Sequence, residues 1–210
     1  MQAIAAIFDV DRTLIRFPSE RLFFLYLLQR RVLTPRRAVL FLRDLFRHTQ
    51  GRYTNKAYLQ GLEKVQLHHL ARDCYSHLIR PRLSATGLAR LREHQRQGHQ
   101  TVILTGSLAC LMEPLHADLQ TDWLIATHLE ITDGRCTGRI QGRHPRGLNK
   151  LLLLQELSQQ AGFALSRSYA YADHVSDLPL LEQVGHPIAV NPAPALKITA
   201  QKRAWPIYRF

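Results

Sequence analysis

The chain of 210 residues has little cysteine and no long apolar run. Its three cysteines, Cys74, Cys110 and Cys136, are an odd number at wide spacing. This excludes a disulfide framework and a zinc motif, and it predicts a reducing, cytoplasmic location. The longest uninterrupted apolar run, Leu22 to Leu28, is too short to span a bilayer as a helix. We therefore expect a protein that folds around its own core.

Acidic residues are scarce relative to basic ones. The 28 Lys and Arg residues against 16 Asp and Glu residues give a net charge of +12, and only five of the basic residues are lysines. Such a charge attracts phosphorylated substrates, nucleic acid or an anionic membrane surface. The arginines are scattered and no nucleic-acid motif accompanies them, which favours a solvated basic surface over a nucleic-acid site. No obligate protein partner can be read from the sequence.

Short apolar runs alternate with helical patterns along most of the chain. The run Ala3 to Phe8 is typical of a buried parallel strand. Similar strands are expected at 100–107, 123–127, 167–172 and 184–190, and a hairpin with an Asp-Gly turn at 129–140. Leucine-rich helices separate them, including one that begins at Gly147 and ends at Gly162. The pattern predicts an α/β fold, a Rossmann-like parallel sheet with helices on both faces.

Residues 16–80 depart from this alternation because their apolar spacing is helical throughout. Helices are expected from a Ser19 cap to Arg30, from Thr34-Pro35 through Phe46, over Asn55–Leu62, and over Leu67–Ile79. We interpret 16–80 as an all-helical cap inserted after the first strand. Residues 1–15 and 81–210 are then the core domain.

Two carboxylates, Asp9 and Asp11, directly follow the first strand. Side chains two apart on a strand point the same way, so these two converge at the edge where open α/β sheets bind ligands. Converging carboxylates repel unless they share a proton or hold a cation. Their hard oxygens suit Mg²⁺. The alternative is a turn in which the Asp side chains bond backbone groups.

Three further stretches carry polar residues at strand or helix ends. Thr105-Gly106-Ser107 ends the second strand, where Ser107 is placed to cap a helix and an anion can approach Gly106. Lys150 stands in the first turn of a helix, where the macrodipole disfavours it unless carboxylates are near. Asp173 and Asp177 follow the strand at 167–172. Ordinary capping and a solvated lysine are the alternative interpretations.

Taken together and in this order, D-x-D-x-T, T-G-S, the first-turn lysine and D-x-x-x-D resemble the haloacid dehalogenase superfamily of phosphohydrolases. The helical insertion looks like the cap of its phosphoserine-phosphatase-like branch. The resemblance implies Asp9 as nucleophile and Asp11 as general acid/base. It implies Thr105 and Gly106 as the phosphoryl-binding residues and Lys150 as the lysine that steadies nucleophile and phosphate.

The same resemblance implies a Mg²⁺ cofactor held by Asp9, Asp11 (through its backbone carbonyl) and Asp173, with Asp177 supporting the metal site. The chain departs from the family pattern at two positions. Ala172 stands where glycine is usual, and His174 where a small hydroxyl residue is common. An alanine forced to positive φ at position 172 would cost about 1 kcal/mol or more.

The expected function is a Mg²⁺-dependent phosphomonoester hydrolase that acts through an aspartyl-phosphate. Its substrate is a small phosphorylated metabolite or a phospholipid head group, the latter at an anionic membrane surface. The alternative is a non-catalytic or regulatory module of the same fold that binds an anionic ligand or nucleic acid. Arg16, Glu20 and Arg52 stand where they could reach a ligand, but we interpret them as solvated surface charges.

Overall fold

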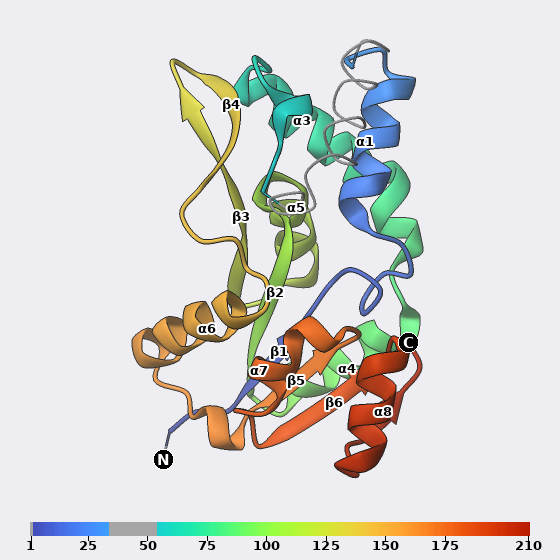
Figure 1. Ribbon diagram of the computed structural model, residues 1–210, viewed down its shortest axis with the longest axis vertical. Helices are drawn as coiled ribbons and strands as arrows, with labels where there is room; N and C mark the ends of the chain where they lie inside the picture. The colour runs from blue at the N-terminus through green and yellow to red at the C-terminus, as the bar shows by residue number, and fades with distance from the viewer. Residues whose placement is uncertain (1, 34–53) are drawn as a thin grey trace.

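A seven-stranded sheet lies at the centre of the computed structural model, which describes residues 2–33 and 54–210 (Figure 1). The strands lie in the order β4-β3-β2-β1-β5-β6-β7. All neighbours pair in parallel except β3 and β4, which form an antiparallel hairpin. The strands are β1 Ala5–Phe8, β2 Gln100–Leu108, β3 Trp123–Thr132, β4 Arg135–Gln141, β5 Tyr169–Ala172, β6 His186–Val190 and β7 Ile207–Tyr208. This confirms the predicted α/β, Rossmann-like sheet.

Helices cover both faces of the sheet. On one face lie α4 and α5, and on the other α6, α7 and α8. Their bounds are α4 Ala85–Arg96, α5 Ala109–Leu119, α6 Leu148–Ala161, α7 Leu178–Leu181 and α8 Pro194–Lys202. In β1, Ala6 and Phe8 pack toward the first layer, and Ala5 and Ile7 toward the second. Burial on both faces explains why this strand reads as an unbroken apolar run.

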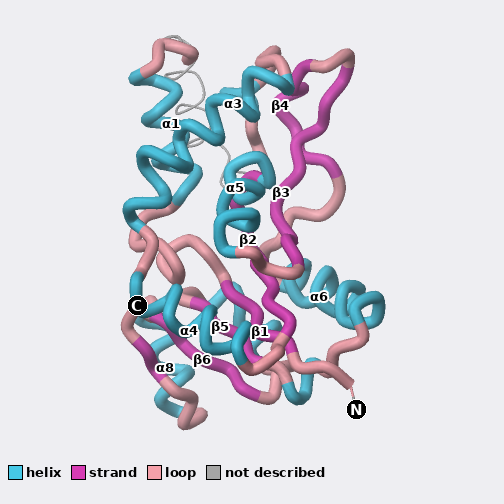
Figure 2. The backbone as a smooth tube through the Cα atoms, turned by 180° about the vertical axis from the view of Figure 1, so that it is seen from behind, coloured by secondary structure: helices cyan, strands magenta, loops and turns pink. Residues whose placement is uncertain are grey.

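The predicted cap lies beyond the carboxyl ends of β1 and β2, as the views from front and back show (Figures 1 and 2). Its described elements are α1 Ser19–Gln29, η1 Ala57–Leu59, α3 Lys64–Cys74, η2 Tyr75–Ile79 and η3 Arg80–Arg82. The β3–β4 hairpin reaches the same region. The Lys64 N–H donates to the Gly134 carbonyl at 2.8 Å, and the Cys136 N–H to the Leu62 carbonyl at 2.9 Å. Helices and a hairpin therefore share this cover, and the division into 1–15 with 81–210 and 16–80 stays a prediction.

Three local predictions in and near the cap are wrong. Pro18, not Ser19, occupies the N-cap position of α1, and the Ser19 side chain makes no cap bond. The helix expected over Asn55–Leu62 is a single 3₁₀ turn, η1. Ser107 does not cap a helix, because β2 continues through Leu108 and α5 begins at Ala109. The helix expected at 34–46, and Arg52, lie outside the described residues.

Candidate active site

The strand ends at 9, 105 and 173 meet at one edge of the sheet. The strand β1 lies between β2 and β5, with Phe8 paired with Ile103 on one side and with Tyr171 on the other. Because parallel strands end at the same edge, this register brings Asp9, Thr105 and Asp173 to similar levels there. The three side chains are buried, at 8%, 1% and 6% exposed. The predicted convergence of the first, second and fourth motifs is therefore present.

Lys150 joins this group from the first turn of α6. Its Nζ donates to Asp9 Oδ1 at 2.7 Å and to Asp177 Oδ2 at 2.8 Å, and the residue is only 3% exposed. Burial opposes the charge on Lys150, but the carboxylates of Asp177 and Asp9 outweigh it and raise the pKa of the ammonium. The alternative of a solvated lysine at a helix start is wrong. Two buried partners outweigh the macrodipole penalty of about 0.3–1 kcal/mol.

Two carboxylates at this edge, those of Asp9 and Asp173, have raised pKa values. Burial, with Asp177 and Asp173 nearby, raises the pKa of Asp9 to about 7 against the lowering effect of Lys150. Burial, followed by Asp177, raises the pKa of Asp173 to about 6. Lys150, and Arg12 in the case of Asp173, therefore do not offset the effect of burial on the pKa of these two carboxylates. A cation at Asp9 and Asp173 would restore both to their ionised forms.

Asp11 faces away from that group, toward the start of α1. Its Oδ1 accepts the Ser19 N–H at 2.7 Å, and its Oδ2 accepts the Ser107 hydroxyl at 2.6 Å. Because the Ser107 hydrogen goes to Asp11, the 2.6 Å contact between the Ser19 and Ser107 oxygens is donated by Ser19. Asp11 thus supplies the helix-cap interaction that the sequence assigned to Ser19, and it holds α1 against β2.

The donor set fits a hard divalent cation in part. Among residues 2–33 and 54–210, no group of three His, Cys, Asp or Glu side chains is arranged to hold a metal. The Asp11 carboxylate accepts hydrogen bonds from Ser19 and Ser107, and the Asp177 carboxylate accepts one from Lys150. Asp9 and Asp173 offer carboxylates, and Asp11 offers its backbone carbonyl. Two carboxylates and a carbonyl, completed by water and a phosphate oxygen, make a set that Mg²⁺ accepts.

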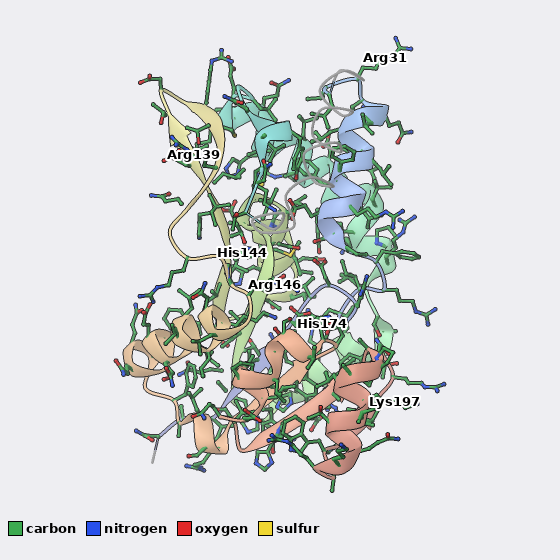
Figure 3. All side chains as sticks on the ribbon, viewed as in Figure 1. Arg31, Arg139, His144, Arg146, His174 and Lys197 are labelled. Atoms are coloured by element: carbon green, nitrogen blue, oxygen red, sulfur yellow. The ribbon has the colours of Figure 1, made fainter. Side chains whose placement is uncertain are left out.

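A cavity of about 380 Å³ opens over these groups. It is lined by Asp9, Asp11, Arg12, Pro18, Glu20, Thr105, Gly106, Ser107, His144, Pro145, Arg146, Lys150, Asp173, His174, Ser176 and Asp177. Every predicted site residue lines it. Figure 3 labels three of the basic side chains at this level, His144, Arg146 and His174, between α6 and the predicted cap.

Several lining residues were missed by the sequence reasoning. His144 and Arg146 lie in the run His-Pro-Arg-Gly just before α6, and the proximity of that run to Lys150 was the available signal. The sequence predicts a solvated charge at Glu20. In the structure Glu20 lines the cavity and accepts hydrogen bonds from Lys56 at 2.5 Å and from Tyr58 at 3.0 Å. Nothing in the sequence pattern pairs Glu20 with Lys56, which is 2% exposed. Arg16 is exposed, as expected.

The two departures from the family pattern leave the backbone unstrained. Ala172 is not among the described non-glycine residues with positive φ, and it pairs with Ala189 in the ladder of β5 and β6. The His174 Nδ1 accepts the Ser176 N–H at 3.1 Å and so caps the short helix η5 Val175–Asp177. The conformational cost considered for Ala172 therefore does not arise.

The fold and this site define a class of protein: an α/β protein with a mostly parallel sheet, whose buried carboxylates and lysine face a small cavity at the carboxyl edge of that sheet. The model of the haloacid dehalogenase-like hydrolase family matches residues 6–182. The chain belongs to this family, and it is a phosphatase of the family. The resemblance drawn from the four motifs is confirmed.

Similar proteins extend over nearly the whole chain. The inhibition of morphological differentiation protein of Streptomyces azureus is 35% identical over 98% of this chain and 78% of its own length. The histidinol-phosphatase of Neisseria meningitidis serogroup C is 28% identical over 98% of both chains.

Solved structures share the fold. A protein of unknown function from Bordetella pertussis Tohama I has a TM-score of 0.88 and 31% identity, covering 99% of each chain. Apo phosphoserine phosphatase has a TM-score of 0.71 at 16% identity, covering 99% of this chain and 94% of its own. The second likeness is one of fold alone.

Proposed function

We propose that this phosphatase hydrolyses phosphomonoesters through an aspartyl-phosphate formed on Asp9, with Mg²⁺ as its cofactor. The observation that supports this most is the ion-paired group of Lys150, Asp9 and Asp177, beside Asp173 in the same cavity. An ion pair with a purely structural role would not require a further buried carboxylate with a raised pKa, Asp173, beside it. A site that awaits a cation and a phosphate accounts for that excess of negative charge.

We assign one residue to each step; for Asp11, the step requires its carboxylate to leave the hydrogen bonds that it makes with Ser19 and Ser107. Asp9 attacks phosphorus, so that an oxygen–phosphorus bond forms on its carboxylate while the ester bond breaks. Asp11 gives a proton to the departing alcohol and later takes one from the water that cleaves the aspartyl-phosphate. Lys150 holds Asp9 in position and balances charge on the phosphoryl oxygens, and Thr105 donates a hydrogen bond to them.

Mg²⁺, when bound by Asp9, Asp173 and the Asp11 carbonyl, supplies positive charge that offsets the repulsion between carboxylate and phosphate. Asp177 acts through Lys150 and not on the substrate directly. Its carboxylate fixes the Lys150 ammonium at 2.8 Å and so helps to aim the lysine at Asp9. We assign Asp177 this supporting role rather than direct coordination.

The substrate we propose is a small phosphorylated metabolite. A cavity of about 380 Å³ has room for a phosphate and a compact alcohol. The histidinol-phosphatase relative, by its name, acts on a phosphomonoester of this size class. A phosphorylated metabolite screen, with histidinol phosphate and phosphoserine included, tests this choice.

A phospholipid head group is the second candidate substrate, favoured by one observation. Phe17, just before α1, and Leu25, in α1, are large apolar side chains that are 55% and 52% exposed. Within the described residues, no helix has the length and apolar character needed to cross a membrane. Flotation with anionic vesicles, with neutral vesicles as the control, separates this candidate from a free metabolite. The cytoplasmic location stays a prediction.

The test of the proposed function is phosphate release from p-nitrophenyl phosphate. We expect release with Mg²⁺, none with EDTA, and none from Asp9→Asn. No release from the wild type in Mg²⁺, or undiminished release from Asp9→Asn, would reject the proposal. Salt-dependent binding of DNA or RNA without any turnover would support the non-catalytic alternative instead.

A further inference from the structure

The loop between β4 and α6, residues 142–147, lies directly on the phosphoryl-binding turn. A Cβ placed on Gly106 would lie 3.3 Å from His144 Cε1, 3.5 Å from His144 Nε2 and 3.4 Å from the Pro145 carbonyl oxygen. The His144 ring therefore packs against the Gly106 backbone. Figure 3 labels His144 and Arg146, both of which line the cavity. No catalytic role proposed above uses His144.

A chain of hydrogen bonds links His144 to the same turn, and the direction of each proton can be worked out. The Thr127 hydroxyl donates to the Gly106 carbonyl oxygen at 2.7 Å. A hydroxyl has one hydrogen, so the 2.8 Å contact between Thr127 Oγ1 and His144 Nδ1 must be donated by the ring. Burial, followed by the charges of Lys56, Arg146 and Lys150, lowers the pKa of His144 to about 4. At neutral pH the single ring proton is therefore on Nδ1.

The peptide unit between Gly106 and Ser107 is held at both of its polar atoms. Its carbonyl accepts from Thr127, and its N–H donates to Thr105 Oγ1 at 3.2 Å. Because Thr105 Oγ1 accepts this bond, its own hydrogen points elsewhere and is available to a phosphoryl oxygen in the cavity. The donor and acceptor of each hydrogen bond are therefore fixed. His144 donates to Thr127 and Thr127 donates to the Gly106 carbonyl, while the Ser107 N–H donates to Thr105.

We propose that His144, in its Nδ1–H form, is a positioning residue that sets the direction of the Thr105 hydroxyl through Thr127 and the Gly106–Ser107 peptide. This inference rests on the proposed function, since it gives Thr105 a phosphoryl group to bind. His144 itself contacts no reacting atom. If the ring donor is lost, the Thr127 hydroxyl is no longer oriented, and the peptide that aligns Thr105 can rotate.

Substitutions of His144 by Asn and by Gln distinguish the roles of the two ring nitrogens. In His144→Asn the amide N–H occupies the place of Nδ1–H, whereas in His144→Gln the amide reaches the place of Nε2. We expect His144→Asn to keep kcat within about twofold of wild type. We expect His144→Gln, His144→Ala and Thr127→Val each to lower kcat about fivefold to tenfold, the effect of one hydrogen bond. KM should change less than kcat, and Thr127→Ser should resemble wild type.

A double-mutant cycle adds a readout that a merely structural role would not move. If His144 acts through Thr127, the variant with both His144→Ala and Thr127→Val should lose no more activity than either single variant. Melting temperatures of all variants are recorded alongside. Losses of kcat that multiply, or that follow the melting temperature across the series, would overturn the proposal.

The tautomer is tested without any turnover by ¹⁵N NMR of the histidine ring nitrogens in the wild-type protein near pH 7. The proposal requires a neutral ring protonated on Nδ1, with a change of that signal in Thr127→Val. A ring protonated on Nε2 overturns it, as does activity retained in His144→Gln and lost in His144→Asn. Absence of phosphate release from the wild type would instead overturn the proposed function, and the role of His144 with it.

Discussion

The two ends of the same sheet each carry a polar cluster, and the clusters differ in how their groups are partnered. At the carboxyl end, Lys150 lies between Asp9 and Asp177, and the pKa of Asp9 is raised to about 7, first by burial. At the amino end, around the first residues of β5 and β6, lies a cluster of histidines and tyrosines. Its members are His94, His99, Tyr169, Tyr171 and His186.

The amino-end cluster satisfies its own groups. His94 Nδ1 is 2.8 Å from His99 Nδ1, and His94 Nε2 is 2.8 Å from the Tyr171 hydroxyl. Burial, then His99 and Arg90, lowers the pKa of His94 to about 4, so the ring is neutral at pH 7. Tyr169 stacks on His186 with ring centres 4.3 Å apart. The groups of this cluster are partnered by one another, whereas under the proposed function the carboxylates at the other end take up a cation. The unmet charge marks the functional end.

Among the substitutions considered, Asp9→Asn should have the largest effect. We expect phosphate release to fall by at least about 10³-fold, because the nucleophile is removed. The same change removes a buried carboxylate whose charge the fold disfavours, so the metal-free variant should melt at a higher temperature than wild type. Phosphate release and a thermal melt measure the two effects. A variant that is less active and also less stable would contradict this account of the site.

Lys150→Met should have the next largest effect, now on both activity and stability. It leaves the Asp9 and Asp177 carboxylates buried without their cation, which costs about 3 kcal/mol of unfolding free energy at pH 7. Phosphate release should fall by about 100-fold or more. Urea denaturation and the phosphate assay test this, with Lys64→Met, at the exposed start of α3, as the matched control. The control should change stability by less than about 0.5 kcal/mol. Equal effects of both substitutions would remove the central role of Lys150.

Ser107→Ala tests the contact between Asp11 and β2. The substitution removes the 2.6 Å hydrogen bond to Asp11 Oδ2, and hydrogen bonds to charged groups contribute about 1.5–3 kcal/mol. We expect kcat to fall by about tenfold. Ser84→Ala, which removes the N-cap of α4, should cost about 1 kcal/mol of stability with no change in kcat. If Ser84→Ala slows turnover as much as Ser107→Ala does, the effect is general destabilisation.

The smallest expected effect on turnover belongs to the amino-end cluster. Because the pKa of His94 is lowered from 6.5 to about 4 in the folded chain, the unfolded chain binds more protons between those values. The free energy of unfolding should therefore fall as pH drops through that window, by at most about 1.4 kcal/mol per pH unit from this residue. Urea denaturation at pH 7 and pH 5 should show a smaller pH dependence in His94→Gln than in wild type. An unchanged pH dependence would contradict the assignment, and kcat at pH 7 should be unaffected.

The sheet and the predicted residues of the site could be inferred from sequence because strand ends and motif order are local signals. The carboxyl-edge position of Asp9, Thr105 and Asp173 follows from β1 lying between β2 and β5. What could not be inferred depends on long-range pairing. No periodic pattern in the sequence predicts that Glu20 pairs with Lys56 or that Ser107 contacts Asp11.

Local signals also misled in two places where tertiary contacts compete with capping rules. Ser19 has the right residue type for a helix cap, but Asp11 accepts its backbone N–H and Ser107 takes its hydroxyl. Ser107 looked like a cap because a helix follows, yet β2 runs on to Leu108. In both cases the carboxylate of Asp11 is the stronger acceptor.

Binding of Mg²⁺ to the substrate-free protein tests the account most directly. Thermal unfolding is followed at neutral pH, with excess Mg²⁺ and with EDTA, for wild type and for Asp173→Asn. Wild type should melt about 3 °C or more higher with Mg²⁺, because the ion binds the folded state and relieves the repulsion between Asp9 and Asp173. Asp173→Asn should show little or no rise. No rise in wild type, or the same rise in both proteins, would contradict a cation site at this edge.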